Sequence, residues 1–115
     1  MARPAIDLVQ GSLDIIVLKT LSWQPMHGFG IARWIQQTTD DVLQVEEGSL
    51  YPSLYRMENK GWVKSEWRIT ENNRRAKYYR LTAAGRRQLA DQAANWETFV
   101  RAMAKILRSS APQPA

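Results

Sequence analysis

Cysteine is absent from the sequence, and histidine occurs once, at His27. The lack of cysteine excludes disulfide bonds, thiol chemistry and zinc or iron–sulfur sites built on cysteine, and it is compatible with a reducing cytoplasm. A single histidine without such partners does not make a metal site. We therefore expect His27 to have a structural role, and we expect neither a metal nor a cofactor.

Long apolar runs are also missing. No stretch approaches the ~18 apolar residues that a membrane span needs, and Asp7 and Asp14 interrupt the apolar core that a signal peptide would require. A chain of 115 residues fits one domain with one modest core. These observations predict a soluble, cytoplasmic, single-domain protein.

Catalytic clusters are not recognisable in the sequence. The acid pairs Asp40–Asp41 and Glu46–Glu47 have no nucleophile or oxyanion-stabilising group beside them. The glycines of residues 28–30 lack the third glycine and the preceding strand of a phosphate-binding loop. We therefore do not expect an enzyme.

Positive charge is what the chain has in excess, and it is concentrated in one window. The formal net charge is +5, but residues 56–87 contain ten Lys or Arg and three Glu, which makes this window +7 and the rest of the chain −2. Most charge runs are solvated surface. A one-sided excess of this size favours a polyanion partner.

Hydrophobic periodicity predicts two helices in the first part of the chain. The first begins at Ser12 as its N-cap and ends near residues 23–25, and the second opens around residues 26–28 and ends in polar residues. A short extended piece is predicted at residues 42–45.

A third helix, a hairpin and a long last helix follow. Ser49 is the predicted N-cap of the third helix, with Pro52 in the first turn and Gly61 as a left-handed stop. Alternation with period two then predicts two strands, at residues 63–69 and 76–81, joined by a polar turn. The last helix runs from a cap at Thr82 to about Leu107.

This order predicts a mainly α fold with a small β-hairpin (α+β): a winged helix-turn-helix followed by a C-terminal dimerisation helix. We expect the winged domain at residues 8–81 and the dimerisation helix at residues 82–108. The tails, residues 1–7 and 109–115, are expected to be disordered.

The third helix meets the requirements of a recognition helix, which needs an apolar face for the scaffold and a polar face for the major groove. Leu50, Leu54 and Met57 would face inward. The residues predicted to contact DNA from this helix are Ser49, Tyr51, Pro52, Ser53, Arg56 and Lys60. An ordinary surface helix with one arginine is the alternative.

The hairpin strengthens the nucleic-acid interpretation. Arg74 and Arg75 lie at its predicted tip and Lys77 follows on the return strand. Arginines are drawn into a narrow minor groove by its negative potential, while strand lysines can bind phosphates. Edge charges that prevent aggregation would explain the lysines, but they explain a double arginine at the tip less well.

Four motifs in order resemble the PadR family of bacterial transcriptional regulators. They are MHGFGI at residues 26–31, EGSLYPSLYRME at 47–58, KGW at 60–62 and RRAKYYRLT at 74–82, and the likeness spans roughly residues 8–107. The resemblance implies a winged-helix repressor that binds operator DNA as a homodimer. It also implies that Tyr51, Pro52 and Arg56 belong to the recognition helix and residues 74–77 to the wing. The single C-terminal helix is similar to that of the short-tailed members.

The last helix carries an apolar seam spaced four and three residues apart, as in a coiled coil. Its members, predicted to form the dimer interface, are Leu89, Ala93, Trp96, Val100, Met103 and Leu107. Packing of the helix on its own domain is the alternative. A twofold dimer would present two recognition helices to half-sites ~34 Å apart on a pseudo-palindromic operator.

Aromatic residues on the seam allow a further hypothesis. Trp96, Phe99 and Val100 could line a cleft for a small, planar, hydrophobic effector, although aromatics on a helix seam are usually packing alone. The sequence thus predicts a DNA-binding regulator with duplex DNA and a second copy of the chain as partners. The alternative is a winged-helix module that binds proteins.

Overall fold

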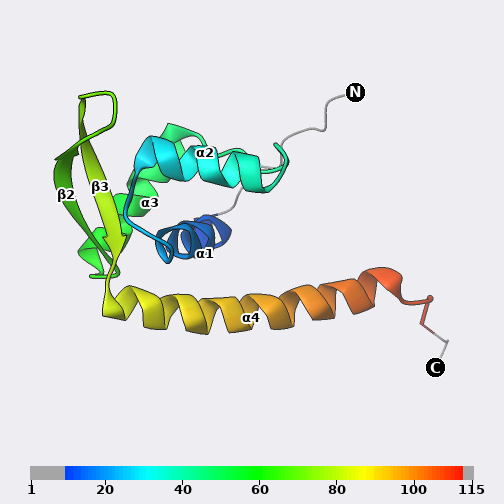
Figure 1. The fold of residues 1–115 in the computed structure, drawn as a ribbon. Helices are drawn as coiled ribbons and strands as arrows, with labels where there is room; N and C mark the ends of the chain where they lie inside the picture. The colour runs from blue at the N-terminus through cyan, green and yellow to red at the C-terminus, as the bar shows by residue number, and fades with distance from the viewer. Residues whose placement is uncertain (1–9, 113–115) are drawn as a thin grey trace.

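The computed structural model describes residues 10–112 and has four helices and a small sheet (Figure 1). In chain order the elements are α1 (Gln10–Leu21), β1 (Met26–His27), α2 (Gly28–Thr38), α3 (Glu47–Asn59), β2 (Val63–Ile69), β3 (Arg75–Leu81) and α4 (Ala83–Arg108). The first three helices cluster beside the sheet, and α4 runs along one side of this cluster and extends past it. The predicted α+β architecture and the order of the main elements are confirmed. The predicted N-terminal tail and residues 113–115 lie outside the described residues.

One hydrophobic core holds the first three helices to the sheet. Its fully buried members are Val17, Leu18, Leu21, Ile31, Ile35, Leu50, Leu54, Met57 and Val63, with Leu13, Tyr79 and Leu81 nearly so. The three predicted inward residues of the recognition helix are all among them. The polar side chains of Asp14 and Ser53 are also buried in this region.

Two of the predicted helix starts are wrong. Ser12 lies inside α1, which begins at Gln10, and Ser49 is the third residue of α3, whose N-cap is Glu46 without a side-chain cap bond. Pro52 therefore lies beyond the first turn, where its ring removes the bond that another residue would donate to the carbonyl of Gly48.

Other predicted boundaries are confirmed. Thr82 caps α4 by accepting a hydrogen bond from the N–H of Gly85 at 3.0 Å. Gly61 has a φ of +77°, the left-handed conformation that ends α3 at low steric cost.

The sheet has three strands rather than the predicted two. In the order β1–β3–β2, β1 pairs antiparallel with β3, so that Met26 lies opposite Tyr79 and His27 opposite Tyr78. A strand of two residues is too short to show a period in the sequence. The extended piece predicted at residues 42–45 is not one of the strands of this sheet.

The start of α4 is packed against the backbone that follows α3, and Gly85 makes this contact possible. A Cβ at Gly85 would lie 2.1 Å from the carbonyl oxygen of Trp62 and 2.7 Å from Cδ1 of Leu81. We expect Gly85→Ala to lower the free energy of unfolding by about 3 kcal/mol, because backbone atoms cannot move aside cheaply. Denaturant unfolding measures the change. Gly48→Ala is the matched control, since a Cβ there meets nothing within 4 Å, and an equal loss in the control would contradict the prediction.

Candidate nucleic-acid interface

The exposed face of α3 is polar and nearly neutral. Its exposed side chains include Ser49, Tyr51, Pro52, Tyr55 and Asn59. Tyr51 is 43% exposed and Tyr55 is 68% exposed, but the hydroxyl of Tyr51 lies against Gly28 in α2, where it would be 2.6 Å from a Cβ. Tyr55 is not among the residues that the sequence singled out for contact, although helical spacing already placed it on the outer side. Hydroxyl and amide groups of this kind can bind base edges or phosphates.

Ser53 does not belong to this face, which corrects the sequence prediction. Its relative exposure is 1%, and its hydroxyl donates a hydrogen bond of 2.6 Å to Oδ1 of Asp14 in α1. The step of 100° per residue predicts the direction of the Ser53 side chain only approximately. Because the side chain is enclosed between α1 and α3, it cannot contact DNA in this arrangement.

Arg56 also turns toward α1. Nη2 of Arg56 lies 2.6 Å from Oδ1 of Asp14, and its side chain is 29% exposed. The positive charge predicted for DNA is therefore paired within the protein. Lys60, at the end of the helix, is exposed and has its ammonium 4.7 Å from the ring centroid of Trp62.

The hairpin carries its arginines at the tip, where the sequence placed them. Arg74 and Arg75 are both exposed, and the guanidinium of Arg75 lies 4.8 Å from the ring centroid of Trp67. The turn is closed by a hydrogen bond of 2.7 Å from the N–H of Thr70 to the carbonyl of Arg74, with Asn73 at a φ of +56°. The tip is thus an ordered turn that displays two positive charges.

Glu58 connects α3 to both long strands of the hairpin. It accepts a hydrogen bond from the hydroxyl of Ser65 in β2, and its Oε1 lies 3.8 Å from Nζ of Lys77 in β3. The charge of Lys77, a predicted DNA contact, is therefore partly compensated. Helix and hairpin are held beside each other, as joint contact with adjacent grooves requires.

Tyr79 lies in β3 beneath this junction and is 6% exposed. Burial raises the pKa of Tyr79, and the nearby Glu58 and Tyr51 raise it further. All three causes disfavour the phenolate. Tyr79 is accordingly a neutral packing residue at the base of the interface.

Arg33 in α2 lines the same hollow, of about 660 Å³, as Arg74 and Arg75 of the hairpin. His27 and Phe29 also line it. Sequence analysis did not single out Arg33, because it lies outside the basic window of residues 56–87. Its proximity to the wing depends on how α2 packs against the sheet, and no sequence pattern reports that.

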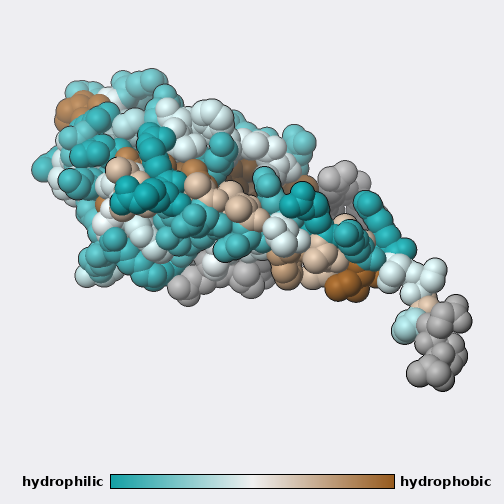
Figure 2. Space-filling model, turned by 90° about the horizontal axis from the view of Figure 1, so that it is seen from below, coloured by the Kyte–Doolittle hydropathy of each residue, from teal (hydrophilic) through white to brown (hydrophobic). Residues whose placement is uncertain are grey.

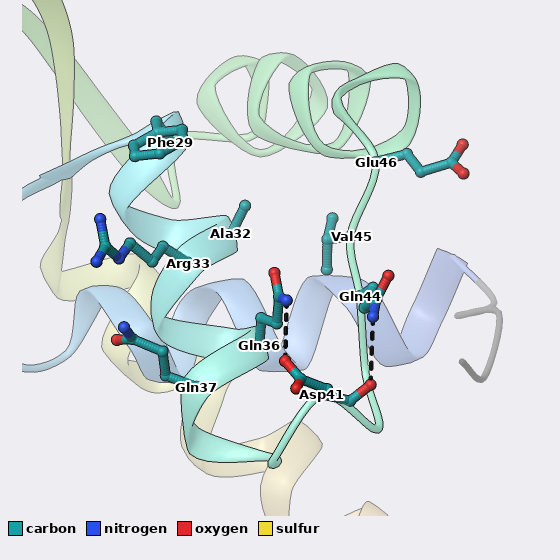
Figure 3. Close-up of a pocket in the computed structure, with 9 residues that line it drawn as sticks. All are labelled: Phe29, Ala32, Arg33, Gln36, Gln37, Asp41, Gln44, Val45 and Glu46. Atoms are coloured by element: carbon teal, nitrogen blue, oxygen red, sulfur yellow. Dashed lines mark hydrogen bonds between the residues drawn. The ribbon is translucent and has the colours of Figure 1, made fainter. Parts of the chain in front are cut away.

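A second hollow, of about 470 Å³, lies between α2 and the segment that leads into α3 (Figure 3). Nε2 of Gln36 donates a hydrogen bond of 2.9 Å to Oδ1 of Asp41, and Nε2 of Gln44 lies 3.5 Å from the carbonyl oxygen of Asp41. Arg33 and Glu46 carry opposite charges at its margins. The side chains drawn there are amides, carboxylates, one arginine and apolar groups.

The C-terminal part of α4 presents an apolar surface. Trp96, Val100, Met103 and Leu107 are exposed, as are Phe99 and Ile106 beside them. Figure 2, viewed from below, shows hydrophobic colour near the far end of this helix. Leu89, predicted to lie in the dimer seam, instead packs against the domain's own core, and Ala93 is half-buried. The middle turns of α4 lie beside α1, while the later turns extend beyond α1.

Trp96 and Phe99 lie together at the beginning of this apolar surface. Their ring centroids are 5.6 Å apart, and both line a hollow of about 530 Å³ between α4 and the first turns of α1, beside Ile15. Flat, adjacent rings at the edge of an apolar hollow can bind a planar hydrophobic molecule.

Membrane and metal sites are not evident in the described part of the chain. Among residues 10–112, no helix combines the length and the apolar character needed to cross a bilayer. In the same residues, His, Asp and Glu side chains do not gather in groups of three that could hold a metal ion.

Comparison with known proteins gives one family. The sequence profile described as the transcriptional regulator PadR-like family matches residues 17–91. A transcriptional regulator of Mycobacterium tuberculosis is 35% identical over 69 residues, which are 59% of this chain and 64% of that protein. A transcriptional regulator from Clostridium thermocellum has a TM-score of 0.78 at 28% identity, over 86% of this chain and 96% of the other.

A second solved structure agrees. The PadR family transcription regulator from a hypervirulent Clostridium difficile has a TM-score of 0.72 at 28% identity, over 83% of this chain and 97% of the other. The predicted winged-helix fold and the predicted regulatory class, as opposed to an enzyme, are confirmed by these likenesses. This chain belongs to the PadR-like family of transcriptional regulators.

Proposed function

We propose that the protein is a homodimeric repressor that binds a pseudo-palindromic operator in the bacterial cytoplasm and so is found on the nucleoid. In each protomer α3 enters the major groove, and the hairpin tip with Arg74 and Arg75 enters the adjacent minor groove. The observation that carries this proposal is the junction at Glu58, which attaches the strands of the hairpin with the arginine tip to the helix with the exposed polar face.

The residues proposed to contact DNA are a revised set. From the sequence prediction, Ser49, Tyr51, Pro52, Lys60, Arg74, Arg75 and Lys77 remain, and the structure adds Tyr55 and Arg33. Ser53 is withdrawn because it is buried. Since the exposed face of α3 is nearly neutral, most of the phosphate affinity is assigned to the hairpin.

Homodimerisation through α4 is supported by the exposed apolar residues Trp96, Val100, Met103 and Leu107. An apolar seam of this length is rarely left in water by a monomer. Two protomers related by a twofold axis would then place their recognition helices in successive major grooves, ~34 Å apart.

Selection of bound sequences from a randomised duplex pool tests the proposal as a whole. We expect enrichment of an inverted repeat, with log affinity falling steeply as log salt rises. Transcription in vitro from a promoter that contains the selected site should decrease when the protein is added. A protein that binds all duplexes equally, or only other proteins, would support the alternative of a protein-binding winged-helix module.

The apolar hollow beside Trp96 and Phe99 is proposed to take a planar hydrophobic effector that relieves repression, with Val100 completing the lining in the dimer. The two rings are adjacent and more than two fifths exposed. We expect planar dyes to quench tryptophan fluorescence, and Trp96→Ala to remove that quenching. Trp23→Ala, which removes an exposed tryptophan elsewhere on the surface, is the control, and quenching that persists without Trp96 would refute the site.

A further inference from the structure

Asp14 is a buried acid that belongs to none of the proposed contact surfaces. It lies in α1, its residue exposure is 8%, and the same carboxylate oxygen is the acceptor for two groups of α3. These groups are the hydroxyl of Ser53 and the guanidinium of Arg56, each at 2.6 Å. Because Ser53 and Arg56 are three residues apart, one carboxylate holds one side of a single helical turn.

The apolar packing between α1 and α3 is less directional than the polar contacts at Asp14. Residues such as Val17, Leu54 and Met57 contribute an attraction that depends on buried area. Hydrogen bonds and ion pairs have defined lengths and angles. A buried ion pair seldom stabilises a fold more than an apolar pair of the same shape does. We therefore attribute to this pair an effect on the orientation of α3 rather than on stability.

The pairing also removes Arg56 from the charge that DNA would meet. Its guanidinium and the carboxylate of Asp14 together are neutral, whereas Arg74 at the wing tip is exposed. Phosphate neutralisation determines how steeply affinity falls with salt. An arginine held by an internal acid should contribute little to that slope.

We propose that Asp14 and Arg56 are positioning residues, which fix the rotation of α3 on α1 so that its outer face meets base edges, and that Arg56 acts on DNA through Asp14 rather than by contact. The inference rests on the proposed function of α3 as the recognition helix. Ser53 is the third member of this arrangement, and its hydroxyl keeps the carboxylate oxygen directed toward α3.

The experiment measures two quantities with the full chain: the ratio of affinity for the selected site to affinity for random duplex, and the slope of log affinity against log salt. The variants are Arg56→Gln, Asp14→Asn, the double variant and, as a charge-matched control, Arg74→Gln. Thermal unfolding confirms that each variant is folded. Ser53→Ala, which leaves the ion pair in place, serves if Asp14→Asn does not fold.

We expect Arg56→Gln to lower the affinity ratio about tenfold and to leave the slope unchanged, while Arg74→Gln lowers the slope by about one. Asp14→Asn should lower the ratio about as much, and the double variant should lose no more than the worse single variant, because both changes remove one interaction. Ser53→Ala should reduce the ratio about threefold at constant slope.

A slope lowered by about one in Arg56→Gln, with the ratio intact in Asp14→Asn, would overturn the inference and make Arg56 a direct phosphate contact. If Asp14→Asn does not fold, an unchanged affinity ratio in Ser53→Ala would also overturn the inference. A wild-type ratio near one is a separate result, which would instead refute sequence-specific binding and hence the proposed function.

Discussion

Replacement of both Arg74 and Arg75 by glutamine is expected to lower affinity for the selected DNA about a hundredfold at moderate salt. Each exposed arginine that enters a narrow minor groove contributes about 1.4 kcal/mol, which is a factor of ten. The slope of log affinity against log salt should also fall by about two, because two phosphate-neutralising charges are lost. Folding should be unaffected, since both side chains are exposed. Fluorescence anisotropy with labelled duplex over a salt series measures both effects.

The control for this variant removes the same charge elsewhere. Arg101 and Lys105 are exposed on α4, and a step of 100° per residue puts them on the side away from the seam of Val100 and Met103. Their double replacement by glutamine should change affinity no more than about threefold. Equal losses in the two double variants would mean that net charge alone governs binding, and the wing would lose its assigned role.

Introduction of charge into the α4 seam is the second large expected effect. Val100→Glu together with Met103→Glu should convert the dimer to a monomer, because four carboxylates would face one another across the twofold axis in a desolvated interface. The two side chains are 45% and 39% exposed in the isolated chain, so the winged domain should stay folded. Loss of bivalent contact should lower operator affinity by at least about a hundredfold. Sedimentation equilibrium measures the mass, and anisotropy measures the affinity.

Ala102→Glu is the matched control for the dimer variant. Ala102 is exposed and lies on α4 between the two seam positions in sequence but off the seam in space. We expect this variant to remain dimeric and to bind the operator normally. A wild-type protein that sediments as a monomer, or a seam variant that stays a dimer, would show that α4 is not the dimerisation element.

Much of the fold could be predicted from local sequence signals. Thr82 and Gly61 mark the two helix ends that the structure confirms, and each acts through its own backbone geometry or side chain. The predicted cap at Ser49 is wrong because the helix begins at Glu47, after Glu46, which is not one of the residue types that usually mark a helix start. The two-residue strand β1 could not be predicted, because its existence depends on pairing with Tyr78 and Tyr79.

The residues of the candidate site were also predicted correctly in part and wrongly in part. The arginines of the hairpin tip were predicted correctly as exposed, because a polar turn between two strands has no core to enter. The directions of Ser53 and Arg56 were predicted wrongly, because both turn toward an acid that is far away in the sequence. Leu89 was assigned to the seam because its spacing fits, and only the contact with the core distinguishes it from Val100.

Sequence alone determined the order of the elements, the concentration of positive charge in residues 56–87 and the apolar seam of the last helix, because periodicity, turns and charge are local properties of a chain. Tertiary structure decided which of those charges remain available for DNA. The carboxylate of Asp14 engages Arg56 and that of Glu58 engages Lys77, whereas Arg74 stays exposed at the tip. The physical reason is that an arginine's availability depends on the nearest acid in space, and packing of α1, α3 and the hairpin brings those acids into place.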